Sequence, residues 1–327
     1  MPSRSGVVAV ALVSTAAACL FPDASSLSGD GGSEASAPDA PSDAPAADAE
    51  TGADADAATD AGPVCDPSKP FTSVTAISEL DDGDDQYKST VTPDELEIWY
   101  GYTRIADGGK IQHVMHASRA SRSAPFGAPA LEPNLTTVSV DPAVSDDGLT
   151  LFYSALGSIG NWDLFVATRP ARTAAFTTPA QLAGPIQSTA ADVASFVAFD
   201  GALWMSSARS GTGDIWRTPP QGGGFGSPAF VASLSSPSDE TGIALTHDGL
   251  WAYVTSTRTD VGNVGGYDVF LAHRATTADD FGPLVDQSDV SSAFGDRANW
   301  ISWDNCRLYF DSNRNGSNDL FVATKSP

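Results

Sequence analysis

The chain has 327 residues, with 41 Asp and Glu against 17 Lys and Arg, which gives a formal net charge of −24. Such an acidic protein repels the phosphates of nucleic acids and anionic lipid headgroups. Nucleic acid and the membrane surface are therefore excluded as main partners, apart from any lipid attached to the chain itself.

Residues 1–18 are predicted to be an export signal. Arg4 supplies a positive charge, and the apolar run from Gly6 to Ala18 is too short to span a bilayer as a helix. The small residues before Cys19 resemble the lipobox of bacterial lipoproteins, although that family usually has Leu where Ala16 stands. The resemblance implies cleavage before Cys19 and lipidation of its thiol. The alternative is an ordinary secretory signal that is cut after one of the alanines.

Residues 19–64 are predicted to be a disordered acidic tether. From Leu20 to Val64 there is no Lys, Arg, Trp or Tyr, and Ala, Asp, Pro, Ser and Gly dominate. This composition cannot bury enough apolar surface to offset the entropy of ordering, and its like charges and prolines extend it. We expect it to hold the folded part, residues 65–327, away from the membrane. The alternative is an acidic tail that binds a basic partner or cations.

Internal repeats indicate the fold. A strand that carries an Asp, an aliphatic and an aromatic residue recurs at intervals of 50 to 54 residues. Its copies begin at Asp163, Asp214, Asp268 and Asp319, with a degenerate copy at His113. Each copy is preceded by a hairpin, usually around Asp-Gly, and most are followed by a Phe that often has a Pro after it. Four strands per unit, repeated without a helical pattern, are typical of a β-propeller.

The count of repeats predicts an all-β fold, a single five-bladed β-propeller. A lone Phe strand, residues 71–80, stands at the front, and the chain ends just after Asp319-Leu320-Phe321. We expect residues 71–80 to form the outer strand of the last blade and so close the ring. The repeats from Phe71 to Lys325 resemble the WD-like repeat of TolB-type propellers. The resemblance implies the fold but no particular role, because that family serves many functions.

Two further cysteines fall in the blade that both ends of the chain share. Cys65 precedes the closing strand, and Cys306 lies in the hairpin of the last blade. Exported compartments favour disulfides, so we predict a Cys65–Cys306 bridge, with two unpaired thiols as the alternative.

An acidic residue lies just before each predicted inner strand. These residues are Asp85, Asp141, Asp192, Asp239 and Asp296. In a ring they would lie near one mouth of the channel and could bind a cation or a polar ligand. The alternative is that each caps a turn or bonds the backbone of a neighbouring blade.

One loop resembles a calcium-binding loop, and Ca²⁺ is the one cofactor that the sequence suggests. Oxygen-bearing side chains alternate around a glycine, at Asp311, Asn313, Asn315 and Asp319. The loop lacks the later Glu of such sites and coincides with a loop present in every repeat. A purely structural loop is the alternative.

No catalytic motif stands out. The sequence has no Gly-x-Ser-x-Gly elbow, phosphate loop, dinucleotide fingerprint or His/Cys metal cluster, and the tryptophans lie mostly in strand patterns typical of a core. We predict a non-enzymatic, monomeric lipoprotein whose propeller binds an envelope protein, peptide or glycan. Leu20 is not the Asp that retains lipoproteins at the inner membrane, which favours the outer membrane, on its periplasmic or outer side. The alternative is a lectin or glycosidase with carboxylates at the channel mouth.

Overall fold

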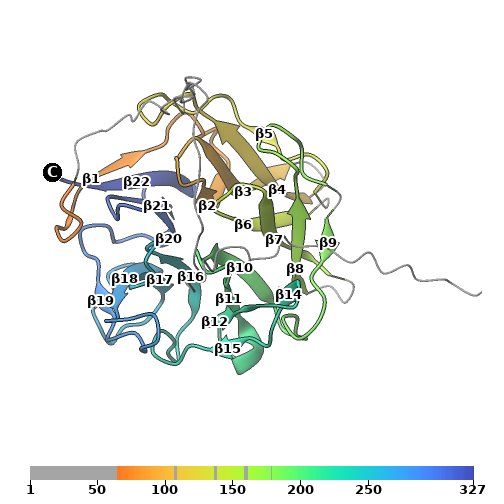
Figure 1. Ribbon diagram of the computed structural model, residues 1–327. Helices are drawn as coiled ribbons and strands as arrows, with labels where there is room; N and C mark the ends of the chain where they lie inside the picture. The colour runs from red at the N-terminus through yellow and green to blue at the C-terminus, as the bar shows by residue number, and fades with distance from the viewer. Residues whose placement is uncertain (1–64, 107–108, 136–137, 158–160, 178) are drawn as a thin grey trace, which may run out of the picture. The chain divides into compact units, whose positions relative to one another are not determined.

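The computed structural model describes residues 65–327 except 107–108, 136–137, 158–160 and 178. The predicted signal, Cys19 and the tether lie outside the described residues. Five antiparallel sheets of four strands each form a ring around a central channel, which confirms the predicted five-bladed β-propeller (Figure 1). Within the described ranges, no helix has the length and hydrophobicity needed to cross a membrane.

Blades 1 to 3 follow in chain order, each with its strands running from the channel outward. Blade 1 comprises β2 (Asp85–Val91), β3 (Glu97–Ala106), β4 (Gly109–Ser118) and β5 (Ala130–Leu131). Blade 2 comprises β6 (Ser139–Val144), β7 (Thr150–Leu156), β8 (Trp162–Thr168) and β9 (Ala180–Gln181). Blade 3 comprises β10 (Asp192–Val197), β11 (Leu203–Ser207), β12 (Asp214–Thr218) and β15 (Ala229–Phe230).

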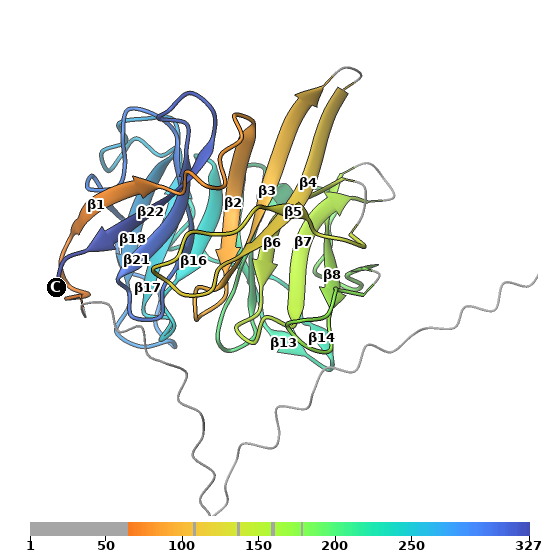
Figure 2. The same cartoon turned by 90° about the horizontal axis from the view of Figure 1, so that it is seen from above.

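Blades 4 and 5 complete the ring. Blade 4 comprises β16 (Glu240–Leu245), β17 (Trp251–Ser256), β18 (Asp268–His273) and β19 (Val285–Asp286). Blade 5 comprises β20 (Asp296–Ile301), β21 (Arg307–Ser312), β22 (Asp319–Lys325) and β1 (Phe71–Ala76). Outside the blades lie a hairpin of β13 (Pro220–Gln221) and β14 (Gly224–Phe225) and a 3-10 helix, η2 (Ala208–Ser210). Strands β3 and β4 have 10 residues each and project beyond the other blades (Figure 2).

The two ends of the described chain close the ring in blade 5, as predicted. β1 pairs antiparallel with β22, with Phe71 opposite Lys325 and Ala76 opposite Phe321. The predicted Cys65–Cys306 disulfide is also confirmed, and it joins residues 241 positions apart. The last blade is therefore held by a strand pair and a covalent bond between the two ends of the domain.

The recurring Phe of each repeat has a structural role. A cation lies over its ring in four blades, with Arg119 over Phe126, Arg169 over Phe176, Arg274 over Phe281 and Lys325 over Phe71, at 4.4 to 4.9 Å. These cations end or directly follow the third strand of a blade, and the Phe precedes or begins the fourth. Burial of the ring and the cation–π contact thus fix the outer edge of the blade.

Candidate functional site

The predicted acidic residues Asp192 and Asp296 are fully buried at the start of β10 and β20. The carboxylate of Asp192 accepts hydrogen bonds from Arg209 and from the hydroxyl of Ser207, both at 2.6 Å. Asp296 repeats the ion pair with Arg314, at 2.5 Å. Each carboxylate therefore ties the inner strand of its blade to the loop after the second strand.

The other acidic positions do not complete a ring with these two. Asp239 lies one residue before β16, and Glu240 takes the repeat position, where it pairs with Arg258 at 3.1 Å. Asp85 accepts a hydrogen bond from the backbone N–H of Asn318 in blade 5, at 3.0 Å. These contacts are those expected of caps and links between blades.

Asp141 differs because it faces the central channel. A β-bulge in β6 gives it a positive φ of 50°, and a bulge in β2 does the same for Lys88, with φ 51°. The ammonium of Lys88 crosses the channel and donates to the carbonyl oxygen of Thr241 in blade 4. Burial lowers the pKa of Lys88, against the nearby carboxylates of Asp141 and Asp311. The channel is closed here, with no room for a water molecule among the described side chains that line it.

The titration of Asp141 predicts an effect of pH on stability. Burial raises its pKa to about 6, although Lys88 opposes the shift. A raised carboxyl pKa contributes stability that is present below the unfolded pKa of about 3.9 and is lost as pH rises through the folded pKa. Between about pH 4 and pH 7, the free energy of unfolding of the wild type should therefore fall by roughly 2 kcal/mol more than that of Asp141→Asn.

Urea unfolding at a series of pH values measures this difference. The exposed Asp280 provides a matched control, and Asp280→Asn should follow the wild-type pH dependence. Parallel curves for wild type and Asp141→Asn would contradict the proposed titration.

The oxygens of the predicted calcium loop are largely engaged by protein groups. Asp311 is fully buried and accepts from the backbone N–H of Lys88 (2.9 Å), from Asn299 (3.0 Å) and from Arg297 (3.1 Å). Asn313 accepts from a backbone N–H at 2.8 Å, and Asp319 begins β22 and accepts from Ser317, also at 2.8 Å. Asn315 lies exposed in the loop between them. In the described ranges, no three or more His, Cys, Asp or Glu are grouped to hold a metal ion.

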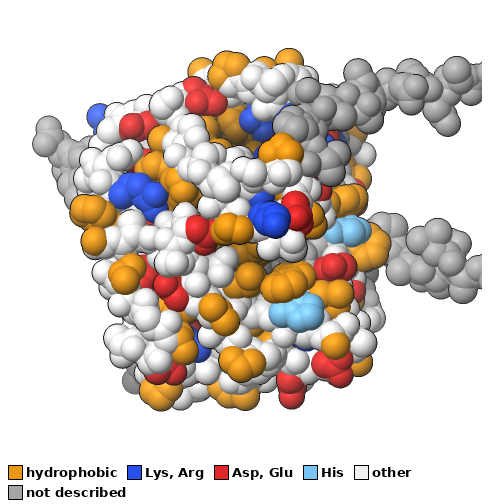
Figure 3. All heavy atoms as spheres, turned by 90° about the vertical axis from the view of Figure 1, so that its left-hand side faces the viewer, with side chains coloured by type: hydrophobic (Ala, Val, Ile, Leu, Met, Phe, Trp, Pro, Cys, Tyr) orange, Lys and Arg blue, Asp and Glu red, His pale blue; other side chains and the backbone are white. Residues whose placement is uncertain are grey.

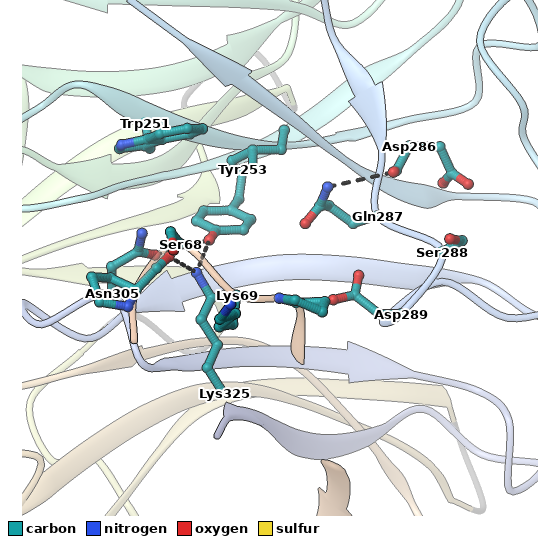
Figure 4. Close-up of a pocket in the computed structure, with 13 residues that line it drawn as sticks. Ser68, Lys69, Trp251, Tyr253, Asp286, Gln287, Ser288, Asp289, Asn305 and Lys325 are labelled. Carbon is teal, nitrogen blue, oxygen red and sulfur yellow. Dashed lines mark hydrogen bonds between the residues drawn. The ribbon is translucent and has the colours of Figure 1, made fainter. Parts of the chain in front are cut away.

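A pocket lies at the junction of blades 4 and 5 (Figure 4). This junction groove has a volume of about 430 Å³, within the range of small-molecule sites. Trp251 and Tyr253 come from β17, and Asp286 and its neighbours come from the outer edge of blade 4. Residues 67–70, next to the disulfide, and Lys325 of β22 complete it. The lining residues are Pro67, Ser68, Lys69, Pro70, Trp251, Tyr253, Leu271, Asp286, Gln287, Ser288, Asp289, Asn305 and Lys325.

Hydrogen bonds hold the base of the junction groove. The Tyr253 hydroxyl donates to Asn305 at 2.8 Å, and the Lys325 ammonium contacts that hydroxyl at 3.3 Å and the carbonyl of Pro67 at 2.8 Å. Burial lowers the pKa of Lys325 to about 8, against the nearby Asp289 and other carboxylates. In Figure 4 Trp251 lies on one side of Lys325 and the two carboxylates on the other.

Asp286 has an unsatisfied polar group. Its Oδ1 atom is buried and has no hydrogen-bond partner among the described residues. Burial, together with the negative charges of Asp268 and Asp289, raises the pKa of the Asp286 carboxyl. A buried acceptor of this kind is stabilised when a donor from a ligand reaches it.

No motif in the sequence pointed to Trp251, Asp286 or Lys325 as residues of a site. One signal was present, because the cation over the recurring Phe is arginine in three blades and lysine only at Lys325. Lysine has a shorter side chain than arginine. At the junction of blades 5 and 1, the corresponding space is filled by Arg119 and Arg307. The surface that includes this side of the ring mixes acidic, basic and hydrophobic side chains (Figure 3).

No protein-family model matches the chain, and no curated protein matches it. Solved structures do match, and they include TolB propellers, as the repeats implied. TolB from Acinetobacter baumannii is 15% identical with a TM-score of 0.42, over 76% of this chain. The chain spans only 57% of the length of that protein.

A putative glycosidase from Bacteroides thetaiotaomicron is also similar. It is 14% identical with a TM-score of 0.50, over 81% of this chain and 96% of its own. A putative TolB from Agrobacterium tumefaciens is 15% identical with a TM-score of 0.47, over 73% of this chain and 76% of its own. At these identities the similarity shows the propeller fold alone.

Proposed function

We propose that this protein is a non-catalytic binding module of the bacterial cell envelope, with the junction groove between blades 4 and 5 as its ligand site. The signal at residues 1–18 exports it, a lipid on Cys19 anchors it at the outer membrane, and the tether of residues 19–64 gives the propeller reach. A rigid ring that carries a polar groove suits selective binding, because little order is lost when the ligand arrives.

The observation that carries the proposal is the composition of the junction groove. Trp251, whose ring packs on His273 at 4.2 Å, lines the same groove as carboxylates, amides and the Lys325 ammonium. Sugars present an apolar C–H face and many hydroxyl groups, so an aromatic ring with donors and acceptors around it complements them. Among an envelope protein, a peptide and a glycan, this chemistry favours a glycan.

A test of the proposal uses Trp251→Ala and binding to a glycan panel, followed by calorimetry on the best ligand. Because a buried aromatic anchor carries much of the affinity of a site, the variant should bind at least about tenfold more weakly. Trp303→Ala is the matched control, since Trp303 is an exposed tryptophan outside the groove, and it should leave the affinity unchanged. Failure of every glycan to bind, or equal loss in both variants, would count against a glycan site in this groove.

Glycoside hydrolysis is the second candidate, on one observation. Asp286, whose pKa is raised, and Asp289 both line the junction groove, and glycosidases work with a pair of carboxyl groups. Release of reducing sugar by wild type, abolished in Asp286→Asn, would replace the binding role with catalysis. Binding without turnover supports the binding module.

A further inference from the structure

A second pocket lies at the junction of blades 3 and 4 and extends beyond the function proposed above. Its volume is about 200 Å³, which suits a small molecule or one end of a longer one. The side chains that matter are Phe199, Trp204, Arg217, His247 and Arg274. They come from β11, from the turns after β10 and β16, and from the ends of β12 and β18.

Trp204 carries an unpaired donor in this pocket. It occupies the same place in its blade as Trp99, Tyr253 and Tyr309, one residue inward from the turn on the second strand. The polar tips of those three residues donate to side chains beyond their own second strand, at 2.8 to 2.9 Å. Trp204 is only 2% exposed, and its indole N–H has no partner among the described residues. A buried donor left unpaired costs stability that a ligand acceptor would restore.

Arg274 adds an unpaired positive charge. Its Nε donates to the carbonyl of Gly249 at 2.8 Å, while its terminal nitrogens bond no residue in the described part of the chain. Burial and the neighbouring Arg217 lower the pKa of Arg274, against the nearby carboxyl groups of Asp200 and Asp279, so the two guanidinium groups repel each other. An anion between them would relieve that repulsion.

The two aspartates of the pocket limit the charge of that anion. Asp200 already pairs with Arg217 at 2.6 Å. Asp248 accepts from the hydroxyl of Thr246 and the backbone N–H of Leu250, at 2.6 and 2.9 Å. Because these two carboxyl groups lie beside the pocket, a singly charged carboxylate is favoured over a phosphate dianion. A guanidinium also matches a carboxylate in shape.

An apolar rim completes the pocket. Phe199 is 68% exposed and packs its edge on His247, which also stacks with Trp303 at 3.9 Å. Phe199 and His247 both line the pocket. An exposed aromatic row of this kind gains stability by covering an apolar group of a ligand.

We propose that the pocket between blades 3 and 4 binds an organic carboxylate with an apolar flank. The carboxylate accepts hydrogen bonds from the indole N–H of Trp204 and the guanidinium of Arg274, and the flank lies against Phe199. The ligand would be a small organic acid or the acidic end of a larger molecule.

The indole N–H resonances of the full chain test this proposal in an NMR titration with benzoate. Trp204→Phe identifies the resonance of Trp204, which benzoate should shift downfield. The same variant should bind benzoate about tenfold more weakly, the loss expected for one hydrogen bond to a charged group. Trp216→Phe is the matched control, because the indole N–H of Trp216 is also buried and unpaired but lies outside the pocket. It should keep the wild-type affinity.

Two further probes separate the chemistry. Benzamide, which keeps the ring and lacks the charge, should bind at least about tenfold more weakly than benzoate. Inorganic phosphate should not compete with benzoate for the site. If benzamide binds as tightly as benzoate, the site is an apolar pocket. If phosphate binds more tightly than benzoate, it is a phosphate site. Either outcome, or no shift of the Trp204 resonance at millimolar benzoate, would overturn the proposal.

Discussion

Replacing both Cys65 and Cys306 with alanine is expected to lower the free energy of unfolding by about 5 kcal/mol. The bridge closes a loop across a sequence separation of 241, so its removal restores a large chain entropy to the unfolded state. It also frees Cys65 and the adjoining β1, so opening of the ring should begin at the pairing of β1 with β22. Urea unfolding measures the free energy, and hydrogen exchange of β1 reports the local opening.

Reduced wild-type protein is the control for the loss of buried sulfur atoms. Both cysteines are buried, so alanine also removes packing, whereas reduction removes only the bond. Reduction of the wild-type protein should therefore cause most of the decrease of about 5 kcal/mol in the free energy of unfolding that is expected for the double variant. A reduced protein within about 1 kcal/mol of the oxidised one would show that the strand pair alone closes the ring.

Glu95→Gln is expected to destabilise the protein by about 3 kcal/mol. Glu95 is 1% exposed, and its carboxylate accepts from Arg307 at 2.7 to 2.9 Å and from the Tyr309 hydroxyl at 2.8 Å. Arg119 and Arg122 lie at 3.7 Å from it. Glutamine keeps the shape of the side chain but leaves Arg119 and Arg122 without a counter-charge between blades 5 and 1, and leaves Arg307 with Asp304 alone, at 3.0 Å. Thermal and urea unfolding measure the loss.

Two variants test whether charge or backbone conformation is responsible. Glu95 has a φ of 61° at a turn position that Gly148, Gly201 and Gly249 occupy in other blades. Glu95→Gly relieves roughly 1 kcal/mol of backbone strain and should still be less stable than wild type. Arg104→Gln breaks an exposed ion pair and should change stability by less than about 0.5 kcal/mol. A Glu95→Gly protein as stable as wild type would rule out the ion-pair network as a main support.

The fold could be predicted because its information is local and repeated. A turn that is Asp-Gly in three blades, an alternating strand and a recurring Phe mark each repeat, and the number of repeats sets the number of blades. The lone Phe strand and the two cysteines then define the closure, which the β1–β22 pair and the disulfide confirm. None of these steps needed a distance between side chains.

Such reasoning could not place the acidic side chains of the inner strands. Asp141 and Asp192 look alike in sequence, yet Ser139 holds the place of Asp192 in blade 2, and Asp141 lies two residues further along β6, at a β-bulge. Asp192 begins its strand and pairs with Arg209. The sequence also favoured Asp239 over Glu240, which holds the repeat position in blade 4. A shift of one residue reverses the face of a strand that a side chain occupies, and bulges leave no clear mark in the sequence.

The sequence by itself determined the number of blades, the strand that closes the ring and the acidic charge of the protein, because each depends on spacing or composition. Only the tertiary structure decided which side chains meet at the blade junctions. Trp251 and Lys325 line the junction groove, and Trp204 and Arg274 share a pocket, although each pair is distant along the chain. The repeats that specify the ring leave these junction positions free to vary, since blade packing tolerates several side chains there. A residue's partner across a junction therefore depends on the assembled ring and not on its neighbours in sequence.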